Sequence, residues 1–175
     1  KELLSIIWGF EISPFAAELA VINLYRHGVG EYENFPRIDV GNFFERDSGQ
    51  TIEFPATNPA GGRQKISVPI PRFDCVIGNP PYLRSQNQDD LDSAYRDKLF
   101  RCALKAGFQP KAKTDLFAFF IYHATRLMKD GSRLGFVTPA SWLISDYAIS
   151  LQLALLGSIR ITSVIASSAE SFFPR

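Results

Sequence analysis

Four consecutive residues, Asn79-Pro80-Pro81-Tyr82, are the part of the sequence whose types and order point most directly to chemistry. Both prolines stiffen the segment in an extended conformation, and neither carries an N–H. The backbone there offers carbonyl acceptors without donors, and the Asn79 side chain adds another acceptor. The Tyr82 ring adds a flat surface on which a heteroaromatic ring can stack. The tetrapeptide therefore predicts a site for a planar amine. The alternative is a proline-rich turn whose tyrosine lies in the core.

The elements that must position this segment follow an α/β pattern. Residues 73–78 are apolar and predict a strand that runs into the tetrapeptide, and ligands of open α/β sheets bind beyond the carboxyl ends of strands. Apolar stretches alternate with helical patterns along the chain, which is typical of this fold class. The other predicted strands are 6–10, 35–40, 133–138 and 160–166, and the predicted helices are 13–28, 116–127 and 147–156. Residues 129–131 are expected to end the second of these helices. Residues 45–71 are polar and rich in Pro and Gly, which predicts an insertion or loop excursion, with a hairpin as one form it could take.

The composition is that of one ordinary globular domain, with 175 residues, 46% apolar and 21% charged. No apolar run is long enough to span a membrane, and the first residues do not resemble a signal peptide. Cys75 and Cys102 form no CxxC pair, and Cys75 is predicted to be a buried thiol in its apolar strand, for which a cytoplasmic protein is the simplest context. His27 and His123 have no Cys or His at ligand spacing, so no metal site is expected.

Charge is unevenly distributed, although the net charge is only +1. Between residues 84 and 113, basic side chains outnumber acidic ones. This local excess could meet nucleic-acid phosphates, and a solvated helix face explains it equally well. The basic residues are Arg84, Arg96, Lys98, Arg101, Lys105, Lys111 and Lys113, and the acidic ones are Asp89, Asp90, Asp92 and Asp97.

The tetrapeptide after an apolar strand resembles the catalytic motif of amino-group methyltransferases, including the adenine-N6 DNA enzymes. The resemblance implies an S-adenosylmethionine-dependent enzyme with a Rossmann-like fold. It implies that the Asn79 side chain and the Pro80 carbonyl accept hydrogen bonds from the exocyclic amine, with Pro81 completing the rigid motif. It also implies that the Tyr82 ring stacks on an adenine flipped out of double-stranded DNA, which leaves the Tyr82 hydroxyl incidental.

Downstream segments point to the DNA adenine group. Residues 113–120, 127–131 and 134–143 resemble that group, and restriction–modification enzymes that fuse methylase and nuclease are especially similar. The resemblance runs from Ile6 over nearly the whole chain except 45–71. It makes residues 1–175 the central and C-terminal part of a methyltransferase catalytic domain. Two alternatives stay open: methylation of protein glutamine or of RNA guanine-N2, since these also present a planar amine, and a non-catalytic binding or scaffold module.

Three further residues are assigned by the resemblance. Glu11, at the end of the first predicted strand, matches the acid that binds the cofactor's ribose hydroxyls, with a surface carboxylate as the alternative. Asn42 matches a position often held by Asp, which accepts from the cofactor's adenine amine. Asn keeps the acceptor and loses the charge, and an ordinary turn residue is the alternative. Phe173 matches an aromatic residue that stacks on the other face of the flipped base, with a core Phe as the alternative.

The expected position of the cofactor's Gly-rich turn lies about 20 residues before such an acid, which places it before Lys1. The fold is therefore expected to be partial, without the first strand and the Gly-rich turn. Residues 1–175 alone are expected neither to bind S-adenosylmethionine with useful affinity nor to methylate DNA. They are also expected to associate with another chain that covers the gap in the sheet, if the preceding residues do not.

Overall fold

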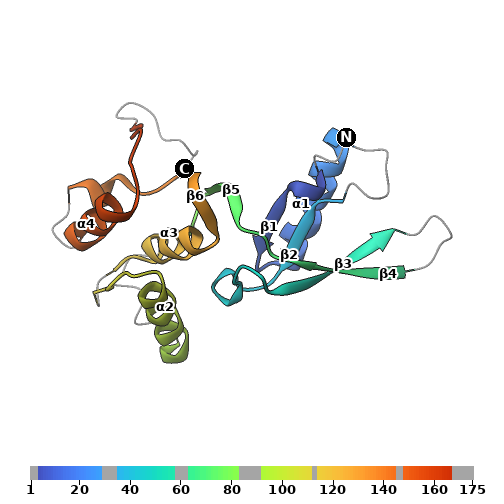
Figure 1. Ribbon diagram of the computed structural model, residues 1–175, viewed down its shortest axis with the longest axis horizontal. Helices are drawn as coiled ribbons and strands as arrows, with labels where there is room; N and C mark the ends of the chain where they lie inside the picture. The colour runs from blue at the N-terminus through green and yellow to red at the C-terminus, as the bar shows by residue number, and fades with distance from the viewer. Residues whose placement is uncertain are drawn as a thin grey trace. The chain divides into compact units, whose positions relative to one another are not determined.

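The computed structural model describes residues 4–28, 35–57, 63–82, 92–111, 114–144 and 148–166. The chain divides into two compact units, Lys1–Phe73 and Asp74–Arg175, and each is described by itself. Short strands alternate with helices along the chain (Figure 1). The predicted α/β class is therefore confirmed.

The first unit contains a β-α-β element. A short 3₁₀ turn (Leu4–Ile6) precedes β1 (Trp8–Glu11), which leads into α1 (Pro14–Gly28) and then β2 (Arg37–Val40). β1 and β2 pair in parallel, with Trp8 opposite Arg37 and Glu11 opposite Val40. The carboxyl ends of both strands therefore lie at the same edge, where open α/β sheets bind ligands.

Ser13 and Pro14 start α1, as the sequence predicts. The Ser13 hydroxyl accepts a hydrogen bond from the Ala16 N–H at 3.4 Å, and Pro14 occupies the first helical position, where a missing N–H costs nothing. The Ser13 N–H in turn donates to Glu11 Oε1 at 2.9 Å. The end of β1 and the start of α1 are thus held together through the Glu11 carboxylate.

Aromatic side chains cover one face of β1. Trp8 and Phe10 lie two residues apart and so point to the same side of the strand. The Trp8 ring meets Phe54 edge-on at 5.4 Å between ring centroids and Phe73 at 6.1 Å. Phe10 lies 5.6 Å from Phe43 and 6.3 Å from Phe73. This cluster is the apolar contact between β1 and the segments that follow β2.

A β-hairpin occupies most of the segment predicted to be an excursion. β3 (Thr51–Thr57) and β4 (Arg63–Pro69) pair antiparallel, with Thr51 opposite Pro69 and Thr57 opposite Arg63. Phe54 of β3 is 2% exposed and anchors the hairpin in the aromatic cluster. Figure 1 shows the two strands as an arm extending from the β1–β2 pair. The hairpin form is confirmed, and the interpretation of residues 45–71 as an insertion stays a prediction.

The second unit holds two paired strands, β6 (Met128–Phe136) and all but the first residue of β5 (Phe73–Gly78). Asp74, near the start of β5, accepts from Lys129 Nζ at 2.8 Å, and Gly78 at its end accepts from the Val137 N–H at 3.0 Å. Asp74 precedes Gly78 in β5, and their partners Lys129 and Val137 follow each other in the same order along β6. The two strands therefore run in the same direction. Their carboxyl ends again meet at one edge, and the tetrapeptide leaves from this edge.

Three helices complete the described part of the second unit: α2 (Ser93–Lys105), α3 (Leu116–Arg126) and α4 (Ile149–Ser158), with a 3₁₀ turn at Ala140–Leu143. None of the helices in the described residues is long and apolar enough to cross a membrane. α3 is the centre of the core, since eight of its 11 residues are buried.

Side chains of α3 connect it to both of the other helices. Its Phe119 ring contacts Phe100 of α2 at 5.6 Å between centroids. Its Tyr122 ring stacks on Phe108 at 3.8 Å, and the Tyr122 hydroxyl donates to the Leu151 carbonyl of α4 at 3.3 Å. Burial raises the pKa of Tyr122, which keeps the phenol neutral as a donor. His123 lies in a helix, as predicted, and is buried there.

Three predictions about local structure are wrong. Residues 160–166 form no strand in the described chain, and Val164 and Ile165 are exposed, because an extended segment becomes a strand only beside a pairing partner. Cys75 is exposed rather than buried, since the face of β5 that carries Cys75 and Ile77 is uncovered by other described residues. β6 begins at Met128, five residues before the predicted strand, and so includes the segment 129–131 that was expected to end the preceding helix.

Candidate active site

Gly78 fixes the point from which the tetrapeptide leaves the sheet. Its carbonyl accepts from the Val137 N–H at 3.0 Å, directly beyond the end of β6. A Cβ at Gly78 would lie 2.9 Å from Cε1 of the Phe136 ring, so only glycine permits this approach without a shift. Because Gly78 has no side chain, the residue that immediately precedes Asn79 can lie directly against the end of β6.

The tetrapeptide folds back on itself through its two polar side chains. The Tyr82 hydroxyl donates to Asn79 Oδ1 at 2.6 Å, across the two prolines. Pro80 is buried, whereas Asn79 and Pro81 are exposed and Tyr82 is 43% exposed. One proline therefore anchors the segment while the amide and the ring remain accessible.

This arrangement offers an acceptor beside an aromatic surface. Asn79 Oδ1 has two lone pairs, of which the Tyr82 hydroxyl uses one. A planar amine could donate to the other while the aromatic ring to which it belongs stacks against Tyr82. The structure gives the Tyr82 hydroxyl a partner in Asn79, and the expectation that this hydroxyl is incidental stays a prediction.

Glu11 and Asn42 lie at one edge of the first unit. Glu11 ends β1, and the Gly41 N–H just beyond β2 donates to the Glu11 carbonyl at 2.9 Å. Asn42 follows directly and caps the 3₁₀ turn Phe43–Glu45, its Oδ1 accepting from the Phe44 N–H at 3.0 Å. The structure therefore brings the two predicted cofactor-binding residues to the carboxyl end of adjacent parallel strands. Asn42 has a capping role there, which is the turn role kept as the alternative.

A buried ion pair beneath Asn42 was not predicted from the sequence. Arg46 donates to both carboxylate oxygens of the buried Asp39, through Nε to Oδ2 and through Nη2 to Oδ1 at 3.3 Å. A Cβ at Gly41 would lie 2.2 Å from Arg46 Nη2, so the guanidinium packs directly on the Gly41 backbone. The pair closes the loop that carries Asn42. The sequence did carry a signal for this pair, since Asp39 lies inside a predicted strand and a buried carboxylate requires a charged or hydrogen-bonding partner.

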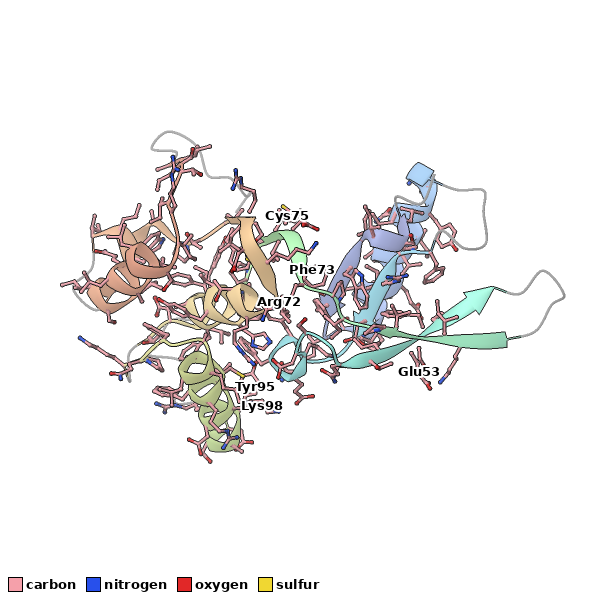
Figure 2. All side chains as sticks on the ribbon, viewed as in Figure 1. Glu53, Arg72, Phe73, Cys75, Tyr95 and Lys98 are labelled. Atoms are coloured by element: carbon pink, nitrogen blue, oxygen red, sulfur yellow. The ribbon has the colours of Figure 1, made fainter. Side chains whose placement is uncertain are left out.

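α2 carries basic residues of the segment 84–113, for which the sequence offered a solvated helix face as one explanation without giving the helix any bounds. Asp92 Oδ1 accepts from the Ala94 N–H at 3.3 Å and starts the helix. Leu99, Cys102 and Ala103 form its buried side. Arg101 and Lys105 are exposed, and Figure 2 labels Tyr95 and Lys98 on the same helix. The basic residues of 96–105 therefore belong to a helix with one solvent-facing side.

The predicted site residues fall into two separate sets. The tetrapeptide belongs to the second unit, whereas Glu11 and Asn42 belong to the first. Phe173 lies outside the described residues, and its assignment as a second stacking residue stays a prediction. No group of three His, Cys, Asp or Glu side chains that could hold a metal ion occurs among the residues that the structure describes.

Comparison with known proteins decides the family. The model of the family described as Eco57I restriction-modification methylase matches residues 5–173 of the chain. The chain belongs to this family. The resemblance inferred from the tetrapeptide and the downstream segments is therefore confirmed at the level of the family.

Curated relatives of this Eco57I-family chain are methyltransferases. It is 32% identical over 77 residues to the adenine-specific methyltransferase BrxX of Escherichia coli O9:H4 (strain HS), covering 43% of this chain and 6% of that protein. It is 34% identical over 77 residues to the type II methyltransferase M.TthHB8I of Thermus thermophilus, covering 42% of this chain and 17% of that protein. It is 22% identical over 102 residues to the type II restriction enzyme and methyltransferase RM.Eco57I of Escherichia coli, covering 58% of this chain and 10% of that protein. The Eco57I-family chain thus spans less than a fifth of the length of any of these relatives.

Proposed function

We propose that the protein transfers a methyl group from S-adenosylmethionine to N6 of an adenine flipped out of double-stranded DNA, within a restriction–modification system. The observation that carries the proposal is the tetrapeptide 79–82 at the end of β5. There an accessible amide oxygen and an accessible aromatic ring lie within one hydrogen bond of each other. Membership of a restriction-modification methylase family and the adenine-specific name of one relative support it.

The proposed chemistry needs two acceptors and a stacking surface. Asn79 Oδ1 and the Pro80 carbonyl would each accept one N6 proton, while the Tyr82 ring stacks on the flipped base. These bonds strengthen as the nitrogen lone pair leaves conjugation with the ring, so they favour the transition state. The N6 lone pair would form the bond to the methyl carbon that S-adenosylmethionine supplies, as the carbon–sulfur bond breaks with its electrons returning to sulfur. One N6 proton then leaves to solvent.

The residues at the carboxyl edge of β1 and β2 fit a nucleoside cofactor. The Glu11 carboxylate is suited to two ribose hydroxyls, and the free lone pair of Asn42 Oδ1 is suited to an adenine amine. S-adenosylmethionine would supply an electrophilic methyl group attached to a sulfonium. A Rossmann-like methyltransferase fold is part of this proposal, supported by the parallel strands joined through α1 and by sites beyond strand carboxyl ends.

The test is a methyl-transfer assay on the full-length protein with radiolabelled S-adenosylmethionine. We expect label in duplex DNA, recovered as N6-methyladenine after digestion to nucleosides. Parallel incubations contain ribosomal RNA and a protein substrate with accessible glutamines. Label confined to guanine-N2 or to glutamine would overturn the DNA assignment. Cofactor-independent DNA binding with no methylation of any substrate would instead favour the binding or scaffold module.

A further inference from the structure

The Asn79 carboxamide is exposed and is held by a single described side chain. Its oxygen accepts from the Tyr82 hydroxyl at 2.6 Å, and no other side chain in the described ranges hydrogen-bonds to this carboxamide. A terminal amide rotates readily about χ2, and a half-turn exchanges its oxygen for its NH₂ group. Without a partner, Asn79 would therefore present an acceptor or a pair of donors to an incoming base.

The hydroxyl biases this choice. A phenol donates a stronger hydrogen bond than its oxygen accepts, because the oxygen lone pair is delocalised into the ring, so the Tyr82 O–H favours the orientation in which Oδ1 rather than the NH₂ group lies beside it. One lone pair of Asn79 Oδ1 then accepts from Tyr82, and one remains free. An exocyclic amine has two N–H groups, and when one of them donates to a backbone carbonyl, the other can donate to this remaining lone pair. A base with a carbonyl at that position would meet the same lone pair and be repelled.

We propose that Tyr82 is a positioning and specificity-determining residue through its hydroxyl, separately from any stacking by its ring. The hydroxyl orients Asn79 so that the site accepts a six-membered ring bearing an amine and rejects one bearing a carbonyl at the same position. This inference rests on the proposed function, because it assumes that the base amine meets Asn79. It assigns the selection of adenine over hypoxanthine to the Tyr82–Asn79 bond.

The experiment uses Tyr82→Phe in the full-length protein, which keeps the ring and removes only the hydroxyl. Single-turnover methylation is expected to fall about three- to tenfold, the effect of losing one hydrogen bond between neutral groups. Affinity for DNA with adenine at the target position is expected to stay unchanged, since stacking is retained. The preference for binding target adenine over target hypoxanthine should shrink, because Asn79 can then rotate and donate to the hypoxanthine carbonyl.

Two controls separate this role from a structural one. Tyr25→Phe removes the hydroxyl of a half-buried tyrosine in α1 and is expected to change neither rate nor discrimination. Tyr82→Phe introduced into an Asn79→Ala background is expected to have no additional effect, since the hydroxyl acts through Asn79. An unchanged rate and an unchanged adenine preference in Tyr82→Phe would overturn the inference, as would an equal loss in the Asn79→Ala background. If the unmodified protein methylates no DNA, the proposed function itself fails instead.

Discussion

The carbonyl of Gly78 accepts a hydrogen bond from the Val137 N–H at 3.0 Å, which ties the residue before the tetrapeptide to the end of the neighbouring strand. Gly78 also lies against the Phe136 ring, where a Cβ would approach to 2.9 Å. The position of Asn79 therefore depends on a glycine that takes no part in the proposed chemistry.

Gly78→Ala is expected to displace the Phe136 ring or β5 itself. Overpacking of this kind costs about 1–3 kcal/mol of unfolding free energy, and methylation should fall because Asn79 moves with Gly78. The control is Gly157→Ala in α4, where a Cβ meets nothing within 4 Å and the substitution should be neutral or slightly stabilising. Denaturant unfolding and the methylation assay measure both effects. Equal behaviour of the two variants would contradict the prediction.

Asn79→Ala is expected to lower turnover by about two to three orders of magnitude, because it removes an acceptor whose bond strengthens in the transition state. Affinity for S-adenosylmethionine should remain near that of the unmodified protein, since Asn79 is assigned to the base. Asn23→Ala, at an exposed amide on α1, is the matched control for activity. Rapid methylation by Asn79→Ala would remove the residue from the mechanism.

Arg46→Met tests the ion pair beneath the Asn42 loop. The substitution keeps much of the side-chain volume and leaves the buried Asp39 carboxylate without its partner. Breaking a fully buried pair lowers the free energy of unfolding by about 3–5 kcal/mol. The loss is expected to be smaller here because the Arg46 side chain is 18% exposed. Affinity for S-adenosylmethionine should fall with it, since the loop that carries Asn42 loses its closure. Both effects are measured on the full-length protein, by calorimetric titration with the cofactor and by thermal unfolding.

Lys65→Met is the control for Arg46→Met. It breaks an ion pair with Glu53 whose side chains are 72% and 59% exposed, where the expected effect on stability is about 0–1 kcal/mol. If Lys65→Met and Arg46→Met have the same effect, the Asp39–Arg46 pair has no special role in the loop.

Combined replacement of Arg101 and Lys105 by Gln tests whether the exposed side of α2 meets phosphates. DNA affinity should weaken for every sequence alike, and the slope of log K against log salt should become shallower by about 0.9 for each lost contact. Arg160→Gln, at an exposed residue after α4, is expected to leave the slope unchanged. An unaltered slope in the double variant would make this side of α2 a solvated face only.

Much of the fold followed from local sequence signals. β5 matches its predicted range of 73–78, and α1 begins at Pro14 because the Ser13–Pro14 pair is a strong helix start. The bounds of α2 were not predicted, although a helix face was one explanation of its charges, because its charged residues obscured the spacing of its few buried ones. The predicted strand at 160–166 failed because pairing depends on a neighbour that local sequence does not reveal.

The residue types located the candidate site in the sequence, but they did not predict its internal geometry. The tetrapeptide identified Asn79 and Tyr82 as an acceptor and an aromatic ring. Their mutual hydrogen bond depends on side-chain rotamers, which the order of residues does not specify. The Asp39–Arg46 pair was missed for a related reason, since the partners are seven residues apart and meet only after the chain turns at Gly41.

The distribution of tryptophan gives each compact unit its own optical reporter. The sequence has two tryptophans, of which Trp8 lies in the aromatic cluster of the first unit and Trp142 in the second, with its Nε1 donating to Thr138 Oγ1 at 3.0 Å. Replacing either one by Phe leaves a single tryptophan in these 175 residues, and its selectively excited emission follows only its own unit. Denaturation curves from the two single-tryptophan proteins would coincide if the units unfold together and would separate if one melts before the other.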